Sequence, residues 1–260
     1  MRSVRHLRVA TLVALAALGN ACSDSSTGPT DVQPADLSQV LAELQPTSIA
    51  PLNSRISAAP LTGLGAPVPS SCSYDSATKS FICPSVSVTG ISVSRSFTLL
   101  DASGNPQSQF DKTSTAAVRM KTTFAGTVTS GNSTVAVDQQ QDMTLSGLLT
   151  GVHRLDGTSL GHVNGTIGNG TTTTPIATTI TTSISNLVLP QSSTGPNRFP
   201  ASGTIVAITR TTVGALPTVT VQTSITFKGD KMATVVITTG GQTTNCLVDL
   251  SGETATVCTM

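Results

Sequence analysis

A serine flanked by glycines lies near the middle of the chain. Gly157, Ser159 and Gly161 match the pattern G-x-S-x-G, and His162 follows directly. In serine hydrolases this pattern exposes the serine on a sharp turn between a strand and a helix, where a histidine acts as its general base. Here Asp156-Gly157 is typical of a hairpin turn, and the residues after His162 are typical of a strand. The sequence therefore favours a turn followed by a strand over a hydrolase site.

Two histidines near this motif form a second candidate site. If Asp156-Gly157 is a two-residue turn, His153 and His162 become diagonal neighbours on one face of a hairpin. Imidazoles bind zinc and related metals, and Asp138 or Asp142 from the adjacent strand would supply a third ligand. A shift of one residue in register would separate the histidines. Solvent-facing histidines are therefore the favoured interpretation, and no metal or cofactor is expected.

Other kinds of chemistry are excluded by spacing or charge. Asp138 and Asp142 share a strand face, but with Gln140 between them they are too far apart to act as a close acid/base pair. Neither G-x-x-x-x-G-K-[ST] nor G-x-G-x-x-G occurs, so no nucleotide site is predicted. The formal net charge is only +1, with no basic cluster and few aromatic residues, which argues against nucleic acid. We therefore expect a protein that is not an enzyme.

The N-terminus carries an export signal. Three arginines within the first eight residues precede an uncharged apolar run at 9–18, and small residues at 19–21 lead to Cys22. This order is the layout of a secretory signal peptide, and the run is too short to span a bilayer as a helix. We expect cleavage after Ala21.

The end of this signal, Leu18-Gly19-Asn20-Ala21-Cys22, resembles a bacterial lipobox, in which the cysteine is acylated and becomes the first mature residue. It departs from that pattern because leucine stands at −4 and Gly19 at −3. Ordinary cleavage at the same bond would leave Cys22 as a free thiol, which is a liability in an oxidising compartment. The resemblance implies a lipid anchor on Cys22, and Ser23 implies release from the inner membrane. We therefore expect an exported, membrane-anchored protein of the cell envelope, in the outer membrane or periplasm.

The other four cysteines form two local pairs. Cys72 with Cys83, and Cys246 with Cys258, each close a loop of about a dozen residues. In an exported protein this spacing predicts two disulfides, each contributing roughly 2–4 kcal/mol. A zinc site would need four thiolates together, and neither pair has C-x-x-C spacing.

Composition divides the chain into four segments. They are a signal peptide at 1–21, a lipid anchor and flexible tether at 22–35, a short helix with a proline-rich extended segment at 36–71, and a β domain at 72–260. The helix prediction rests on four apolar residues at helical spacing, namely Leu37, Val40, Leu41 and Leu44. Pro46 ends that helix.

The β domain is indicated by a hydrophobic period of two. Apolar and polar residues alternate in stretches around 91–99, 116–128, 135–145, 176–184 and 219–227. Turn residues separate these stretches, so we expect an all-β, antiparallel up-and-down meander of roughly ten strands. A nine-residue helix is too short to cover so wide a sheet. We therefore expect the sheet to close into a barrel or to fold as a sandwich.

Three functions are compatible with these features. The favoured one is a non-enzymatic envelope module, structural or protein-binding. The second is a carrier or receptor that holds a small apolar ligand inside the barrel. The third is a hydrolase or metal site around Ser159, His162 and His153. Inward-facing candidates for the carrier are the larger apolar residues of three stretches, namely Val118, Met120, Phe124, Met143, Leu145, Ile225 and Phe227.

Overall fold

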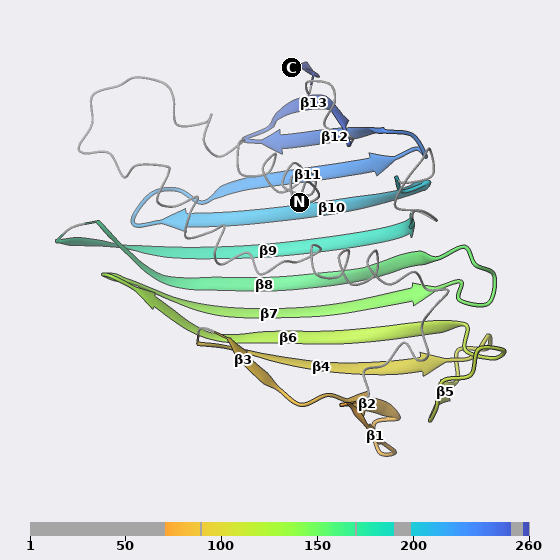
Figure 1. Ribbon diagram of the computed structural model, residues 1–260. Coiled ribbons are helices and arrows are strands. Elements are labelled where there is room, and N and C mark those ends of the chain that lie inside the picture. The colour runs from red at the N-terminus through yellow and green to blue at the C-terminus, as the bar shows by residue number, and fades with distance from the viewer. Residues whose placement is uncertain (1–70, 89, 170, 190–198, 251–256, 260) are drawn as a thin grey trace, which may run out of the picture. The chain divides into compact units, whose positions relative to one another are not determined.

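The computed structural model describes residues 71–88, 90–169, 171–189, 199–250 and 257–259. This part of the chain is a single antiparallel sheet of 14 strands (Figure 1). The predicted all-β fold and antiparallel meander are confirmed. The predictions for the signal peptide, Cys22, the tether and the helix at 37–44 lie outside the described residues. No helix long and apolar enough to span a membrane occurs within the described ranges.

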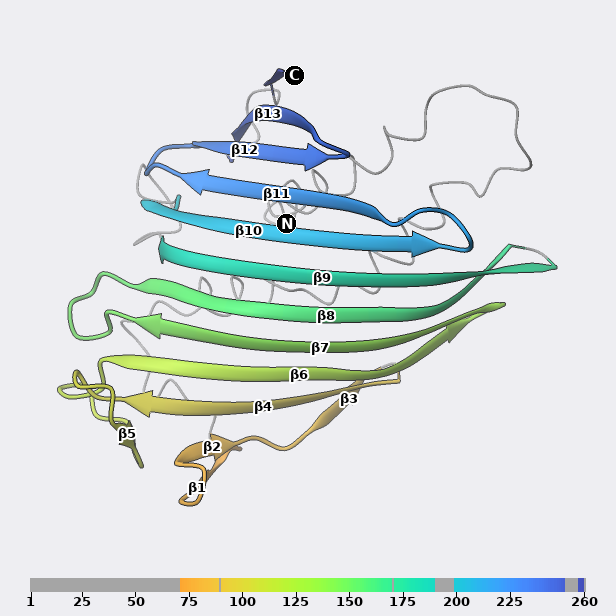
Figure 2. The ribbon, with the colours of Figure 1, turned by 180° about the vertical axis from the view of Figure 1, so that it is seen from behind.

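The strands follow one another across the sheet. Their bounds, in chain order, are β1 (Ser73–Asp75), β2 (Ser80–Ile82), β3 (Val86–Val88), β4 (Ile91–Leu100), β5 (Pro106–Gln107), β6 (Ala117–Ser130), β7 (Ser133–Ser146), β8 (Arg154–Asn169), β9 (Thr172–Val188), β10 (Ser202–Val213), β11 (Val219–Phe227), β12 (Met232–Thr239), β13 (Gln242–Asp249) and β14 (Val257–Thr259). Each long strand pairs with its neighbours in sequence, while β3 and β5 pair with β4 beside the main path. Figure 2 shows the same order from behind.

The sheet is open, so the predicted closure into a barrel is not confirmed. Its pairing path runs from β1 to β14 and does not return to its start. Closing a barrel requires two end strands that pair along their length with a fixed stagger. Here both end strands are only three residues long, and the outer side of β4 is already paired with β2, β3 and β5. All described strands belong to this one sheet, so a second sandwich layer is not seen among them.

The predicted alternation of faces is confirmed. One face, called the apolar face below, carries a row of directly opposed aliphatic side chains from five neighbouring strands: Leu99, Val118, Leu145, Leu155 and Leu187. Four of these are buried, and Leu145 is half-buried. The inward-facing candidates in β6, β7 and β11 lie on this face. The opposite face, called the polar face, carries mainly Thr, Ser and charged side chains.

The predicted disulfides lie at the two edges of the sheet. Cys72–Cys83 closes the β1–β2 hairpin, and Cys246–Cys258 joins β13 to β14 at directly opposed positions. Short edge strands fixed in this way limit the backbone that an open sheet exposes.

Glycines on the apolar face allow unusually close strand contacts. A Cβ atom on Gly126 would lie 2.1 Å from the carbonyl oxygen of Gly90, and one on Gly165 would lie 2.1 Å from that of Thr134. Figure 2 shows these strands bending toward the β6–β7 and β8–β9 hairpins. Because glycine lacks a side chain, it permits such bends in a strand.

These contacts predict opposite results for two glycines on the same face of β8. Gly165→Ala should lower the free energy of unfolding by about 1–3 kcal/mol, because the neighbouring backbone must move. Gly161→Ala is the matched control, since its Cβ would lie 3.5 Å from the flexible Gln139 side chain. Its stability should be unchanged or higher by up to about 1 kcal/mol. Urea unfolding measures both, and equal stabilities of the two variants would contradict this account of the bend.

Candidate functional site

Ser159 and His162, the two residues of the hydrolase interpretation, lie on opposite faces of the sheet. They are three residues apart within β8, and successive side chains in a strand alternate between faces. Ser159 is buried on the apolar face, where the Gln139 amide donates a hydrogen bond to its Oγ at 3.0 Å. His162 is exposed on the polar face, and its Nδ1 lies 3.3 Å from Thr179 Oγ1. The described residues therefore hold no Ser159–His162 dyad.

The predicted turn at Asp156-Gly157 is wrong. These residues lie inside β8, at a β-bulge where the pairing with β9 shifts register. The turn comes earlier, at 147–151, and is closed by a hydrogen bond from the Gly151 N–H to the Gly147 carbonyl. Glycine suits both two-residue turns and bulges, so the Asp-Gly pair does not distinguish them.

The predicted His153/His162 pair is wrong as well, because it assumed a turn at Asp156-Gly157. His153 precedes β8 instead of lying opposite Leu160, whose partner in β7 is Gln140. Partial burial lowers the pKa of His153, which favours its neutral form. Asp138, one of the two carboxylates named in the metal hypothesis, lies directly opposite His162. Within the described ranges, however, no three His, Cys, Asp or Glu side chains are grouped to hold a metal ion.

Charged and hydroxyl side chains cross the polar face in a row. Asp138, His162, Thr179 and Arg210 are directly opposed on β7, β8, β9 and β10. Asp138, His162 and Arg210 are exposed, and Thr179 is half-buried. The His162–Thr179 contact is the hydrogen bond found in this row. The row forms a solvated surface instead of an enclosed site.

A second group of charges lies on the same face, around Asp142, which is four residues from Asp138 along β7. Arg119 donates from Nε to Asp142 Oδ1 at 2.6 Å and forms an ion pair with Oδ2, while Lys121 Nζ lies 3.9 Å from that oxygen. The hydrogen bonds from Arg119 lower the pKa of Asp142. Asp138 and Asp142 therefore share a face, as predicted, but Asp142 is bound to Arg119.

The apolar face contains polar residues that sequence reasoning missed. Thr122, Gln141 and Ser159 are directly opposed on three adjacent strands, and all are buried. Gln141 is 7% exposed, and its Nε2 donates to no hydrogen-bond partner among the residues that the structure describes. The signal was available, because Gln139 and Gln141 occupy the same strand parity as Val137 and Met143. Polar residues at apolar parity mark a buried polar group that needs a partner.

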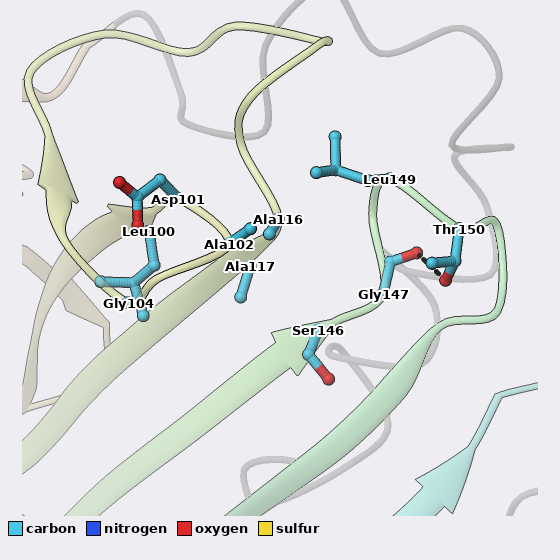
Figure 3. A pocket seen from close by; sticks show the side chains of 10 residues that line it. All are labelled: Leu100, Asp101, Ala102, Gly104, Ala116, Ala117, Ser146, Gly147, Leu149 and Thr150. Atoms are coloured by element: carbon cyan, nitrogen blue, oxygen red, sulfur yellow. Dashed lines mark hydrogen bonds between the residues drawn. The ribbon is translucent and has the colours of Figure 1, made fainter.

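An open depression of about 400 Å³ lies at one end of the sheet. Leu100, Ala102, Ala116 and Ala117 line one side, and Leu149 lies on the other (Figure 3). Its lining is mainly apolar.

Asp101 contributes a carboxylate to the lining of this depression, but that carboxylate accepts hydrogen bonds within its own loop. It accepts hydrogen bonds from the N–H groups of Ser103 and Asn105 and from the Asn105 amide. These bonds, led by the Asn105 side chain, lower the pKa of Asp101. The depression therefore offers apolar contact and no assembled chemistry.

Comparisons with known proteins assign no relative. The chain matches no protein family, no curated protein and no solved structure.

The Arg119–Asp142 pair predicts a pH-dependent contribution to stability. The pKa of Asp142 is lowered in the folded state, so the contribution is present above the unfolded pKa of 3.8 and is lost as pH falls through the lower, folded value. Arg119→Gln should therefore cost about 0.2–1 kcal/mol at pH 7, because the pair is largely exposed, and little at pH 2. Urea unfolding at both pH values measures the difference. An equal cost at both would contradict the ion pair, and Lys121→Gln serves as the weaker control.

Proposed function

We propose that this chain is an exported, non-enzymatic lipoprotein of the cell envelope whose sheet binds a protein partner. The proposed location in the cell envelope rests on the export signal and on the resemblance to a lipobox at Cys22. The binding role rests on the polar face, where the exposed side chain of Leu160 lies among polar neighbours.

The observation that carries this proposal is the position of Leu160. It is 44% exposed in the middle of the polar face, between Gln140 on β7 and Thr181 on β9. Both neighbours are exposed, and the adjoining positions of β8 are polar. An apolar centre within a polar surround is the usual anatomy of a protein–protein interface. Strands on both sides hold this surface rigidly, so binding would cost little conformational entropy.

The lipid anchor is tested by mass spectrometry on protein purified from its native membrane. We expect a diacyl or triacyl increment on Cys22 and no residues before it. Cys22→Ala should move the protein from the membrane fraction to the soluble fraction. A bare mass beginning at Cys22 would contradict the anchor and leave a secreted β-protein.

The binding face is tested by a photo-crosslinking residue at Thr181 in intact cells. We expect one discrete cross-linked species, and Leu160→Glu should remove it by placing a charge at the centre of the interface. Leu216→Glu is the matched control, because Leu216 is 66% exposed in the turn between β10 and β11. Its cross-linking should equal that of the unmodified sequence. Cross-linking that survives Leu160→Glu would overturn this assignment of the face.

A second candidate function is favoured by Gln141. A buried amide donor without a partner costs about 1–3 kcal/mol, and the hydrogen-bond acceptor of an otherwise apolar ligand would remove that cost. The carrier hypothesis in this form places the ligand against the apolar face and does not need a closed barrel.

Gln141→Leu tests the carrier hypothesis. In protein extracted with organic solvent, the substitution should raise the free energy of unfolding by about 1 kcal/mol, because it removes an unsatisfied donor. In protein from the native membrane, it should reduce the amount of apolar compound released on extraction. Gln139→Leu is the control and should destabilise, since its amide bonds Ser159. If extraction of the protein from the native membrane releases no compound, the carrier hypothesis is wrong.

A further inference from the structure

The two edges of the sheet are protected in different ways. The outer side of β4 is covered along its length by three short strands. β3 pairs with 91–93, β2 pairs with Ser96 and Phe97, and β5 pairs with Leu99 and Leu100. Between them, the Cys83 N–H donates to the Arg95 carbonyl at 3.0 Å. This edge therefore presents no long run of backbone to a further strand.

Among the described strands, the opposite edge is covered by β14 alone. β13 is eight residues long, but β14 pairs only with Asn245, Cys246 and Leu247. All three residues of β14 are exposed, and the Cys246–Cys258 disulfide ties its central residue to β13. With β14 removed, no other described strand pairs with the outer side of β13.

The backbone directions at this edge follow from the disulfide position. The Cα atoms of Cys246 and Cys258 are 4.0 Å apart, which fits a non-hydrogen-bonded antiparallel pair, at about 4.5 Å, better than a hydrogen-bonded one, at about 5.5 Å. The backbone groups of Cys246 therefore point to β12, and those of Asn245 and Leu247 point to β14. By the same alternation, those of Thr243 point to the open side.

Side chains at this edge are suited to a second copy of the same strand. Leu247 and Val257 are directly opposed, and they are 46% and 64% exposed. If β13 paired antiparallel with β13 of another copy about a two-fold axis at Leu247, each Leu247 would meet its counterpart. Cys246 would then meet Val248 on the apolar face, where both are buried now. Apolar pairs on both faces stabilise such a ladder. A two-fold contact uses the same edge of both copies, so it forms a closed dimer that adds no further copies through that edge.

We propose that β13 is a strand-addition edge for a second copy of this chain, and that β14 closes it while the Cys246–Cys258 disulfide is intact. Opening takes two electrons and two protons from an external dithiol, which becomes a disulfide, while Cys246 and Cys258 become thiols. β14 then keeps only three residue pairs to β13 and is displaced by β13 of the second copy, which forms five pairs over 245–249 in this register. This inference does not depend on the polar face or on the lipid anchor.

The test compares the two disulfides by sedimentation and by amide hydrogen exchange. With Cys246→Ser and Cys258→Ser together, we expect the average mass to rise with concentration toward that of a dimer. With Cys72→Ser and Cys83→Ser together, the protein should stay monomeric like the unmodified chain, because three strands still cover β4. A monomeric Cys246→Ser/Cys258→Ser protein with a protected sheet would overturn the proposal.

Two further variants separate specific pairing from misfolding. Adding Asn245→Pro removes an N–H that faces the open side and lies opposite Asp249 of the second copy, and adding Leu247→Lys places charges across the two-fold axis. Each should restore the monomer. Association that persists in both would indicate misfolding and reject the edge. If the Cys246→Ser/Cys258→Ser protein does not fold, reduction of the folded Cys72→Ser/Cys83→Ser protein gives the same decision, because the sheet is already formed when the remaining disulfide opens.

Discussion

The antiparallel register of the sheet decides where every side chain in the described part of the chain lies. Each strand from β6 to β9 is at least 14 residues long and pairs with its neighbours over nearly its whole length. A slip of one residue in any of these ladders would move the buried row at Leu99 and Leu155 to the other side. The hydrophobic effect therefore holds the register, and the register separates the apolar face from the polar one. The juxtaposition of Asp138 and His162 results from this constraint, whereas Ser159 and His162 lie apart because side chains alternate within β8.

Much of this arrangement was predictable because it depends on local chemistry. Alternation in stretches such as 116–128 and 219–227 identified strands and assigned their faces correctly, since a half-buried strand must alternate. The spacing of Cys246 and Cys258 gave the correct pairing, because two cysteines so close in a hairpin have few other partners. The polar residues at Gln139 and Gln141 were visible in the same alternation, as exceptions to it.

Other features were not predictable because they depend on the chain as a whole. Whether a sheet closes is set by the length and stagger of its end strands, and the short β1 and β14 carry no distinctive pattern. The bulge beside Gly157 is decided by the match between β8 and two long neighbours, so the local Asp-Gly pair predicted a turn instead. The prediction of a His153/His162 pair was wrong as a consequence, because one misplaced turn changes the cross-strand partner of every residue along a strand. The position of His162 opposite Asp138 is set by the register between β7 and β8.

The order of strands in the sheet has a consequence for how the protein comes apart. Since each long strand pairs only with its sequence neighbours among the described strands, the sheet resembles a one-dimensional array in which stability is a sum of adjacent interfaces. Such an array frays from its ends, where a strand has one neighbour instead of two. The covalent closures at Cys72–Cys83 and Cys246–Cys258 lie at these two ends, so they act as the terminal caps that repeat proteins build from dedicated polar units.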